Sequence, residues 1–202
     1  LGTDPFGTYI ENKLKAEGLD VQISKDEDHF TGYQLKGKVM EGDPEVFYYR
    51  RNSAASCLSV EDIEKVDLEG ARVLHITGIP PALSKSCREA TYRLIERARE
   101  KDMLVSFDPN LRPTLWESQE VMIETINDIA SKADIVLPGT AEGKILMGSD
   151  KPEEIAEFYR KNGAKAVIIK AGGAGAYADW EDGKAFYPGY KVKEVVDTVG
   201  AG

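Results

Sequence analysis

The sequence has few cysteines and no long apolar run. Its 202 residues include only two cysteines, Cys57 and Cys87, which are too few for a disulfide framework and lack a CxxC spacing. We therefore expect reduced thiols and a cytoplasmic protein. No apolar run approaches the roughly 18 residues that a membrane-spanning helix needs, so we expect no membrane partner.

Basic residues are also scarce relative to acidic ones. The chain has 26 lysines and arginines against 35 aspartates and glutamates, which gives a formal net charge of −9. Nucleic acids and anionic membranes bind basic surfaces, so we expect neither as a partner. A small anionic substrate stays open, because a few arginines in a cleft suffice to hold one. The 42% of hydrophobic residues is enough for a buried core and excludes a disordered chain.

Short apolar runs recur about every thirty residues, which is the length of a strand-helix-strand unit. The runs are residues 73–76, 103–107, 135–137 and 166–169. Each is continuous, as is typical of parallel strands covered by helices on both faces. Helical periods fill residues 83–98 and 122–129, and Pro152 begins a third helix. Residues 174–180 and 184–190 are two further short strands. The sequence predicts an α/β fold with a doubly wound, Rossmann-like parallel sheet.

The segment 31–56 differs from the rest because it has no helical period. It is rich in tyrosine, phenylalanine, valine and threonine and is interrupted by the turn residues 41–44, EGDP. We interpret it as an antiparallel hairpin. Because it interrupts an α/β pattern, we predict a small antiparallel β lid at residues 31–56, inserted into a core of residues 1–30 and 57–202.

Polar and glycine residues follow four of the predicted strands. The segments are 108–113 (DPNLRP), 138–142 (PGTAE), 170–175 (KAGGAG) and 197–202 (DTVGAG). Ligands of an open parallel sheet bind at this edge, where the loops diverge and helix N-termini point toward the cleft. The last segment is the strongest signal, because the small residues Gly200, Ala201 and Gly202 leave backbone N–H groups free to bind an anion. For an isolated Gly-x-Gly, a plain tight turn is the alternative.

Segment 197–202 resembles the second signature motif of the ribokinase-like, PfkB-type carbohydrate kinases. Further matches to that family are G-x-D-x-F-G at 2–7, Thr31-Gly32, and K-x-G-x-x-G at 170–175. Segments 48–56, 75–79 and 108–116 resemble the subfamily that acts on 2-keto-3-deoxygluconate. The resemblance implies a ribokinase-like fold and transfer of the γ-phosphoryl group of ATP to a sugar hydroxyl. A fructokinase, a 5-dehydro-2-deoxygluconokinase and a non-catalytic fragment stay open as alternatives.

The resemblance also implies the residues that would bind the sugar. Tyr48, Tyr49 and Arg50 on the lid would face the substrate, and the Arg50 guanidinium would bind the carboxylate of a sugar acid through two parallel hydrogen bonds. A solvated strand residue is the alternative for Arg50. Gln34 stands where this subfamily often has a tyrosine, which alters that contact. Ile79 would touch the sugar as well.

On the phosphate side, the resemblance places Arg112 between the sugar and the phosphates, where a fixed cation stabilises the charge of the transition state. Arg112 would act together with an anion hole formed by Gly200, Ala201 and Gly202. The residues that the resemblance assigns to the nucleotide are Asn110, Lys170, Gly172, Gly175, Thr198, Gly200 and Gly202.

Glu142 matches the acid of a family N-x-x-E motif that organises Mg²⁺ near the phosphates, a task suited to carboxylate oxygens. The asparagine of that motif is Gly139 here. The resemblance places the general-base aspartate directly after Gly202, the last residue, and the sequence has no initiator methionine. We therefore expect a chain that is incomplete at both ends. The expected ligands are a sugar acid, ATP and Mg²⁺, and the expected assembly is a homo-oligomer formed through the lid.

Overall fold

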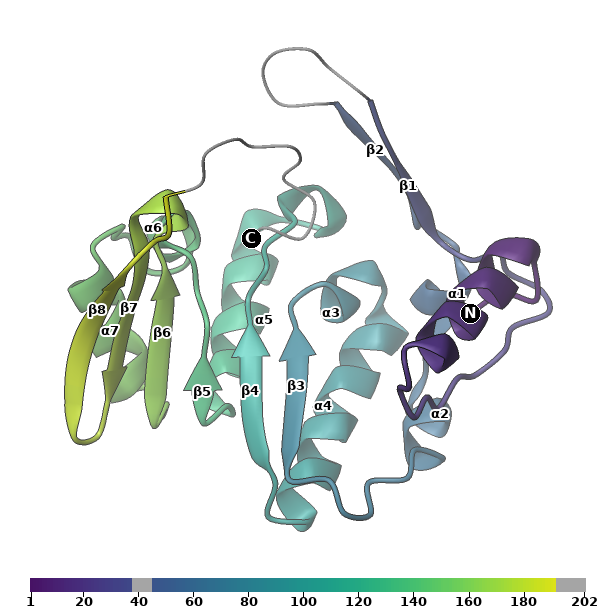
Figure 1. Cartoon of the computed structure of the whole chain (residues 1–202), viewed down its shortest axis with the longest axis horizontal. Helices are drawn as coiled ribbons and strands as arrows, with labels where there is room; N and C mark the ends of the chain where they lie inside the picture. Colours follow the sequence, from purple (N-terminus) through teal and green to yellow (C-terminus); the bar gives the residue numbers. More distant parts are fainter. Residues whose placement is uncertain (38–44, 192–202) are drawn as a thin grey trace. The chain divides into compact units, whose positions relative to one another are not determined.

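The structure is a computed structural model that describes residues 1–37 and 45–191 (Figure 1). The chain divides into two compact units, each described by itself below. The first unit comprises Leu1–Gly70 and Pro80–Leu94, and the second comprises Ala71–Ile79 and Ile95–Gly202. The predicted division into a core and a lid of residues 31–56 stays a prediction.

A six-stranded sheet forms the centre of the second unit, in the order β3-β4-β5-β6-β7-β8 (Figure 1). Its strands are β3 (Val73–Thr77), β4 (Leu104–Asp108), β5 (Ile135–Val136), β6 (Ala166–Lys170), β7 (Gly175–Trp180) and β8 (Gly183–Pro188). Strands β3 to β6 are parallel, and β7 and β8 continue the sheet with antiparallel pairing. The four predicted parallel strands and the two short strands after them are confirmed.

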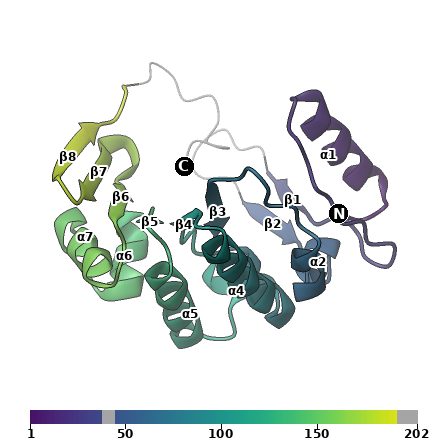
Figure 2. The same ribbon diagram turned by 90° about the horizontal axis from the view of Figure 1, so that it is seen from below.

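Helices α5 (Gln119–Ser131), α6 (Thr140–Met147) and α7 (Pro152–Lys161) lie on the same side of these strands (Figure 2). Helix α5 buries its periodic apolar residues, and α7 begins at the predicted proline. Two 3-10 helices complete the unit, η2 (Pro113–Leu115) and η3 (Gly172–Ala174). Helix α4 (Lys85–Glu100) begins in the first unit and ends in the second.

The burial of the strands differs from the continuous burial expected of all of them. In β4, Val105, Ser106 and Phe107 are all buried, as expected. In β3 burial alternates, because Leu74 and Ile76 are buried while Val73 and His75 are exposed. Strand β4 has a neighbour on each side, whereas β3 is the first strand of the sheet. Burial also alternates in β6, although this strand has a neighbour on each side. The predicted α/β architecture is confirmed, and continuous burial is found in β4 but not in β3 or β6.

The first unit contains an antiparallel hairpin and several short helices. Strand β1 (Tyr33–Lys36) pairs with β2 (Val46–Tyr49), which confirms the predicted hairpin (Figure 1). The helices are α1 (Pro5–Ala16), η1 (Ala54–Cys57), α2 (Val60–Glu64) and α3 (Pro80–Leu83). Among the residues described in either unit, no helix combines the length and the apolar character needed to cross a bilayer.

Asp4 connects the start of α1 to the segment before β1. Its carboxylate accepts hydrogen bonds from the amides of Gly7 at 2.9 Å and Thr31 at 2.6 Å, and these bonds hold the pKa of Asp4 below its usual value. The Thr31 hydroxyl in turn accepts a bond from the Gly2 amide at 3.0 Å. A β-carbon on Gly7 would lie 2.1 Å from the Gly2 carbonyl oxygen, so glycine is required there. The motif at residues 2–7 therefore builds this connection.

Candidate active site

The carboxyl ends of β4 and β6 are joined by an ion pair in the second unit. Lys170 Nζ, at the end of β6, lies 2.7 Å from Asp108 Oδ1, at the end of β4. The same carboxylate oxygen accepts a bond from the Asn110 amide at 3.2 Å. The sequence prediction assigned roles to Lys170 and Asn110 but missed Asp108. Its position as the last residue of a strand at the ligand edge is the signal that would have identified it.

Glu142 lies in the first turn of α6 and connects two strand ends. Its Oε1 accepts a bond from the Leu111 amide at 2.8 Å, and its Oε2 accepts one from the Gly139 amide at 2.6 Å. The carboxylate therefore ties the loop after β4 to the start of α6. A β-carbon on Gly139 would lie 3.3 Å from Oε2, so the glycine leaves that side of the carboxylate open. Each oxygen has a second lone pair with which to contact a cation.

Arg112 folds back over the loop that carries it. Its Nη1 donates to the Leu111 carbonyl oxygen at 2.8 Å and to the Asn110 carbonyl oxygen at 3.4 Å. Asn110 has a φ of 41°, in the left-handed region, where asparagine is among the better-tolerated residues. Arg112 thus lies four residues after the last residue of β4, and its half-buried side chain is held against the loop that follows this strand.

The two glycines after β6 have different surroundings. Gly175 has a φ of 123°, and a β-carbon there would lie 2.0 Å from the Tyr187 carbonyl oxygen. It is therefore required for the pairing of β7 with β8. Gly172 also has a positive φ, of 56°, but a β-carbon there would meet no atom of residues 1–37 or 45–191 within 4 Å. The backbone at Gly172 is thus open to a ligand, while Gly175 serves the sheet.

Ile79 follows β3 at the same edge of the sheet. The amide of the preceding Gly78 donates to the Asp108 carbonyl oxygen at 2.9 Å, and a β-carbon on Gly78 would lie 2.0 Å from the Pro109 carbonyl oxygen. This close approach places Ile79 directly after the point where the ends of β3 and β4 meet. Thr77, opposite Asp108 in the register, has a buried hydroxyl with no hydrogen-bond partner in the described part of the chain.

The lid residues lie in the first unit and do not all share one face. Gln34 lies opposite Tyr48 in the register, and the Arg50 guanidinium carbon lies 4.1 Å from the centre of the Tyr48 ring. The Tyr49 ring instead stacks on Tyr33, with 4.8 Å between ring centres. Successive residues of a strand point to opposite faces, which explains the separation. The structure brings Gln34, Tyr48 and Arg50 together and places Tyr49 on the other face.

Four predicted site residues, Thr198, Gly200, Ala201 and Gly202, lie outside the described residues. Apart from Tyr49 and Gly175, the remaining ones fall into two groups, one in each unit. The lid group, in the first unit, is Gln34, Tyr48 and Arg50. The strand-end group, in the second unit, is Ile79, Asn110, Arg112, Glu142, Lys170 and Gly172, to which the structure adds Asp108.

The first unit thus contains an antiparallel hairpin, and the second contains an α/β sheet with cations and carboxylates at its strand ends. Residues 1–202 match the family described as pfkB family carbohydrate kinase, and the chain belongs to this family. The family resemblance inferred from the sequence is confirmed.

Two similar curated relatives are named 2-dehydro-3-deoxygluconokinase. The one from Bacillus subtilis (strain 168) is 48% identical over 100% of this chain and 63% of its own length. The one from Thermoproteus tenax is 32% identical over 100% of this chain and 62% of its own length. The chain thus spans less than two thirds of the length of these relatives.

Two solved structures extend the comparison to the fold. A PfkB protein from Polaromonas sp. JS666 has a TM-score of 0.89 and 47% identity, over 95% of this chain and 65% of that one. Aminoimidazole riboside kinase from Salmonella enterica, in complex with aminoimidazole riboside and an ATP analog, has a TM-score of 0.83 and 25% identity, over 100% of this chain and 65% of that one. These likenesses confirm the predicted ribokinase-like fold.

Proposed function

We propose that this protein is an ATP-dependent kinase that transfers the γ-phosphoryl group to a hydroxyl of 2-dehydro-3-deoxygluconate. The observation that carries the proposal is the 48% identity, over the whole chain, to a relative named for that activity. The strand-end group of the second unit supports it, because it gathers cations and carboxylates where an α/β sheet binds ligands.

The cations of the strand-end group suit the charge of a transferring phosphoryl group. Phosphoryl transfer depends mainly on positioning and electrostatic stabilisation, since charge spreads over the phosphoryl oxygens. Arg112 would supply a fixed guanidinium at this point. Lys170 is held by Asp108 and would contact the nucleotide from the end of β6. The open backbone at Gly172 would let the nucleotide approach closely.

The carboxylates of the same group suit Mg²⁺, which prefers oxygen ligands and keeps several of its waters. Glu142 and Asp108 would hold the ion, directly or through those waters. Both carboxylates are already oriented by backbone amides, which would limit the reorganisation needed for binding. When bound, the ion would neutralise phosphate charge.

The lid group suits a sugar acid. Arg50 offers a planar guanidinium to a carboxylate, and its position over the Tyr48 ring would restrict its conformations before the substrate binds. Gln34, across from Tyr48, adds an amide that donates to or accepts from a sugar hydroxyl. We therefore assign the substrate carboxylate to Arg50.

A coupled assay of ADP production by the full-length protein tests this function. We expect 2-dehydro-3-deoxygluconate to give a higher kcat/KM than fructose or 5-dehydro-2-deoxygluconate. Arg50→Lys should raise KM for the sugar acid by about tenfold, because an ammonium loses the paired hydrogen bonds, with a smaller effect on kcat. Arg51→Lys, at an exposed neighbouring position, is the matched control and should leave KM unchanged.

The assay contradicts the proposed substrate if fructose is preferred. It contradicts the role of Arg50 if the sugar acid is preferred but Arg50→Lys and Arg51→Lys have the same KM.

The second face of the hairpin supports self-association, which we propose as the assembly of this kinase. Tyr33 and Tyr49 lie opposite each other on this face, as do Leu35 and Phe47, and all four side chains are exposed. Exposed Phe6 extends this apolar surface, with its ring stacked on Tyr33. Contiguous apolar surface of this kind marks interaction sites, and we assign it to a second copy of the chain.

Analytical ultracentrifugation tests the assembly. We expect the full-length protein to sediment as a dimer or larger and Leu35→Glu to shift it toward the monomer, since a charge would be buried without a partner. Lys36→Glu, on the opposite face of the same strand, is the control and should leave the assembly intact. A wild-type protein that is monomeric at every concentration would contradict the proposal.

We propose the cytoplasm as the compartment of this protein, because its two cysteines are free thiols.

A further inference from the structure

Three side chains with different metal-binding chemistry meet in the first unit, away from the lid group. Asp26 and His29 come from the segment before β1, and Cys57 is the last residue of η1. One ligand atom from each side chain, an oxygen, a nitrogen and a sulfur, lies within 4.8 Å of the others. The sugar kinase proposed above makes no use of these residues.

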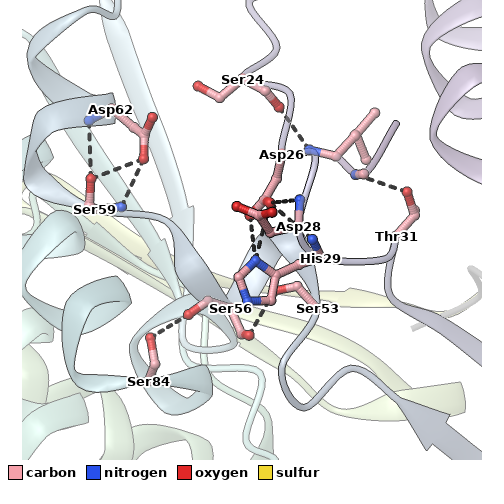
Figure 3. Close-up of polar contacts among 12 residues, drawn as sticks. Ser24, Asp26, Asp28, His29, Thr31, Ser53, Ser56, Ser59, Asp62 and Ser84 are labelled. Carbon is pink, nitrogen blue, oxygen red and sulfur yellow. Dashed lines mark hydrogen bonds and ion pairs between the residues drawn. The ribbon is translucent and has the colours of Figure 1, made fainter. Parts of the chain in front are cut away.

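The carboxylate and the imidazole already face each other (Figure 3). His29 Nδ1 lies 2.9 Å from Asp26 Oδ2. Asp26 Oδ1 accepts bonds from the amides of Asp28 at 2.9 Å and His29 at 3.0 Å. These contacts fix the orientation of the Asp26 carboxylate.

The backbone on both sides of the cluster is held in place. Asp26 bonds through its amide to the Leu1 carbonyl oxygen at 2.9 Å, and its own carbonyl oxygen accepts from the Thr3 amide at 3.2 Å. On the other side, Ala55 lies two residues before Cys57. Its carbonyl oxygen accepts a hydrogen bond from the Cys87 thiol at 3.2 Å. The three donors are thus presented by segments that hydrogen bonds fix, which lowers the cost of ordering them around an ion.

A cavity of about 670 Å³ opens at the cluster, and Asp26 and Cys57 form part of its wall. The side chains that line it include four acidic residues and one lysine, Lys25. Lys25 is paired with Glu11, so the charge of the wall favours a cation. The thiol of Cys57 is exposed, which gives an ion and its waters access to the donors.

From this geometry we propose that Asp26, His29 and Cys57 form a binding site for a divalent transition-metal ion of the Zn²⁺ class. Sulfur and imidazole donors favour such ions, whereas Mg²⁺ and Ca²⁺ require oxygen donors. Zinc bonds of about 2.0 to 2.3 Å place tetrahedral ligand atoms roughly 3.3 to 3.7 Å apart. The observed separations reach that range with small side-chain movements. Water from the cavity completes the coordination.

The site differs in chemistry from the Mg²⁺ site proposed at the strand ends. A bound ion would connect the segment before β1 to η1, the two ends of the hairpin segment that carries Gln34, Tyr48 and Arg50. Because an ion that binds only the folded state stabilises it, we expect binding to raise the melting temperature. The readout is therefore independent of kinase activity.

Titration of metal-free full-length protein with ZnCl₂, followed by calorimetry, tests the proposal, and CoCl₂ gives a spectroscopic signature. We expect a thiolate-to-cobalt charge-transfer band in the wild type. Cys57→Ser should remove that band and weaken Zn²⁺ binding at least about tenfold. His29→Gln should weaken Zn²⁺ binding similarly while its Cys57 thiol stays in place. Cys87→Ser is the matched control, because this second thiol is buried outside the cluster, and it should keep the wild-type band.

The proposal is overturned if Cys57→Ser binds Zn²⁺ as tightly as the wild type, or if the cobalt-saturated wild type shows no thiolate band. A band lost in Cys87→Ser but kept in Cys57→Ser would equally overturn it. Circular dichroism of each variant shows whether it is folded. If Cys57→Ser does not fold, Zn²⁺ binding by His29→Gln provides the second test.

Discussion

Arg112→Ala is expected to lower kcat about a thousandfold in the full-length protein, with a much smaller change in KM for the sugar. A cation that meets the charge of a transferring phosphoryl group contributes mainly in the transition state, and losses of this size are typical of such arginines. Two backbone carbonyl groups hold the Arg112 guanidinium after the end of β4, which would limit its reorganisation in the role proposed above. Steady-state kinetics with the proposed sugar acid and ATP measure the effect.

Arg72→Ala is the control for this prediction. Arg72 is an exposed arginine directly before β3, at the opposite end of the parallel strands, so its removal should leave kcat unchanged. Arg112→Lys should recover part of the loss, since an ammonium restores charge without the guanidinium geometry. A kcat for Arg112→Ala within a few-fold of the wild type would show that Arg112 does not meet the transferring group.

Asp134→Ala is expected to lower the free energy of unfolding of the second unit by about 3 kcal/mol, because it leaves a buried amide without a partner and removes charge-assisted bonds. Asp134 is only 3% exposed. It accepts the Val105 amide at 2.8 Å and contacts Arg99 Nη1 at 2.6 Å and Lys165 Nζ at 2.9 Å. Urea unfolding followed by tryptophan fluorescence measures the change, since both tryptophans, Trp116 and Trp180, lie in this unit.

Asp128→Ala is the matched control for Asp134→Ala. The Asp128 carboxylate pairs with Lys132 at 2.7 Å, but the side chains are 46% and 42% exposed, and pairs at the surface contribute little. We expect a change of about 0.5 kcal/mol or less. Asp134→Asn should fall between the two, because its amide oxygen still accepts the Val105 bond. Equal unfolding curves for Asp134→Ala and Asp128→Ala would contradict the structural role of Asp134.

The acid dependence of stability has the same origin. Burial alone would raise the pKa of Asp134, but the Val105 amide, Lys165 and Arg99 lower it below its usual range. A carboxyl group whose pKa is lower in the folded state stabilises the fold above its unfolded pKa and loses this contribution as the pH falls through the folded value. The Asp134 contribution is therefore present at neutral pH and is lost in acid.

The two tyrosines of β2 lie on opposite faces of the hairpin. The motif assigns both Tyr48 and Tyr49 to the sugar, yet alternation along β2 alone separates them. The register then pairs Tyr48 with Gln34 and Tyr49 with Tyr33. Alternation in the sequence is enough to distinguish the two faces. The contact between the Arg50 guanidinium and the Tyr48 ring, in contrast, is a tertiary contact.

By itself the sequence determined the strands, the hairpin and the polar segments that follow the strands, because apolar periodicity and turn formation depend on residues close together in the chain. Only the tertiary structure decided that Lys170 pairs with Asp108, 62 residues earlier, and that Glu142 ties the loop after β4 to α6. It alone brought Cys57 to Asp26 and His29. Such contacts depend on strand order and on the path of the connecting segments, and no local pattern encodes them.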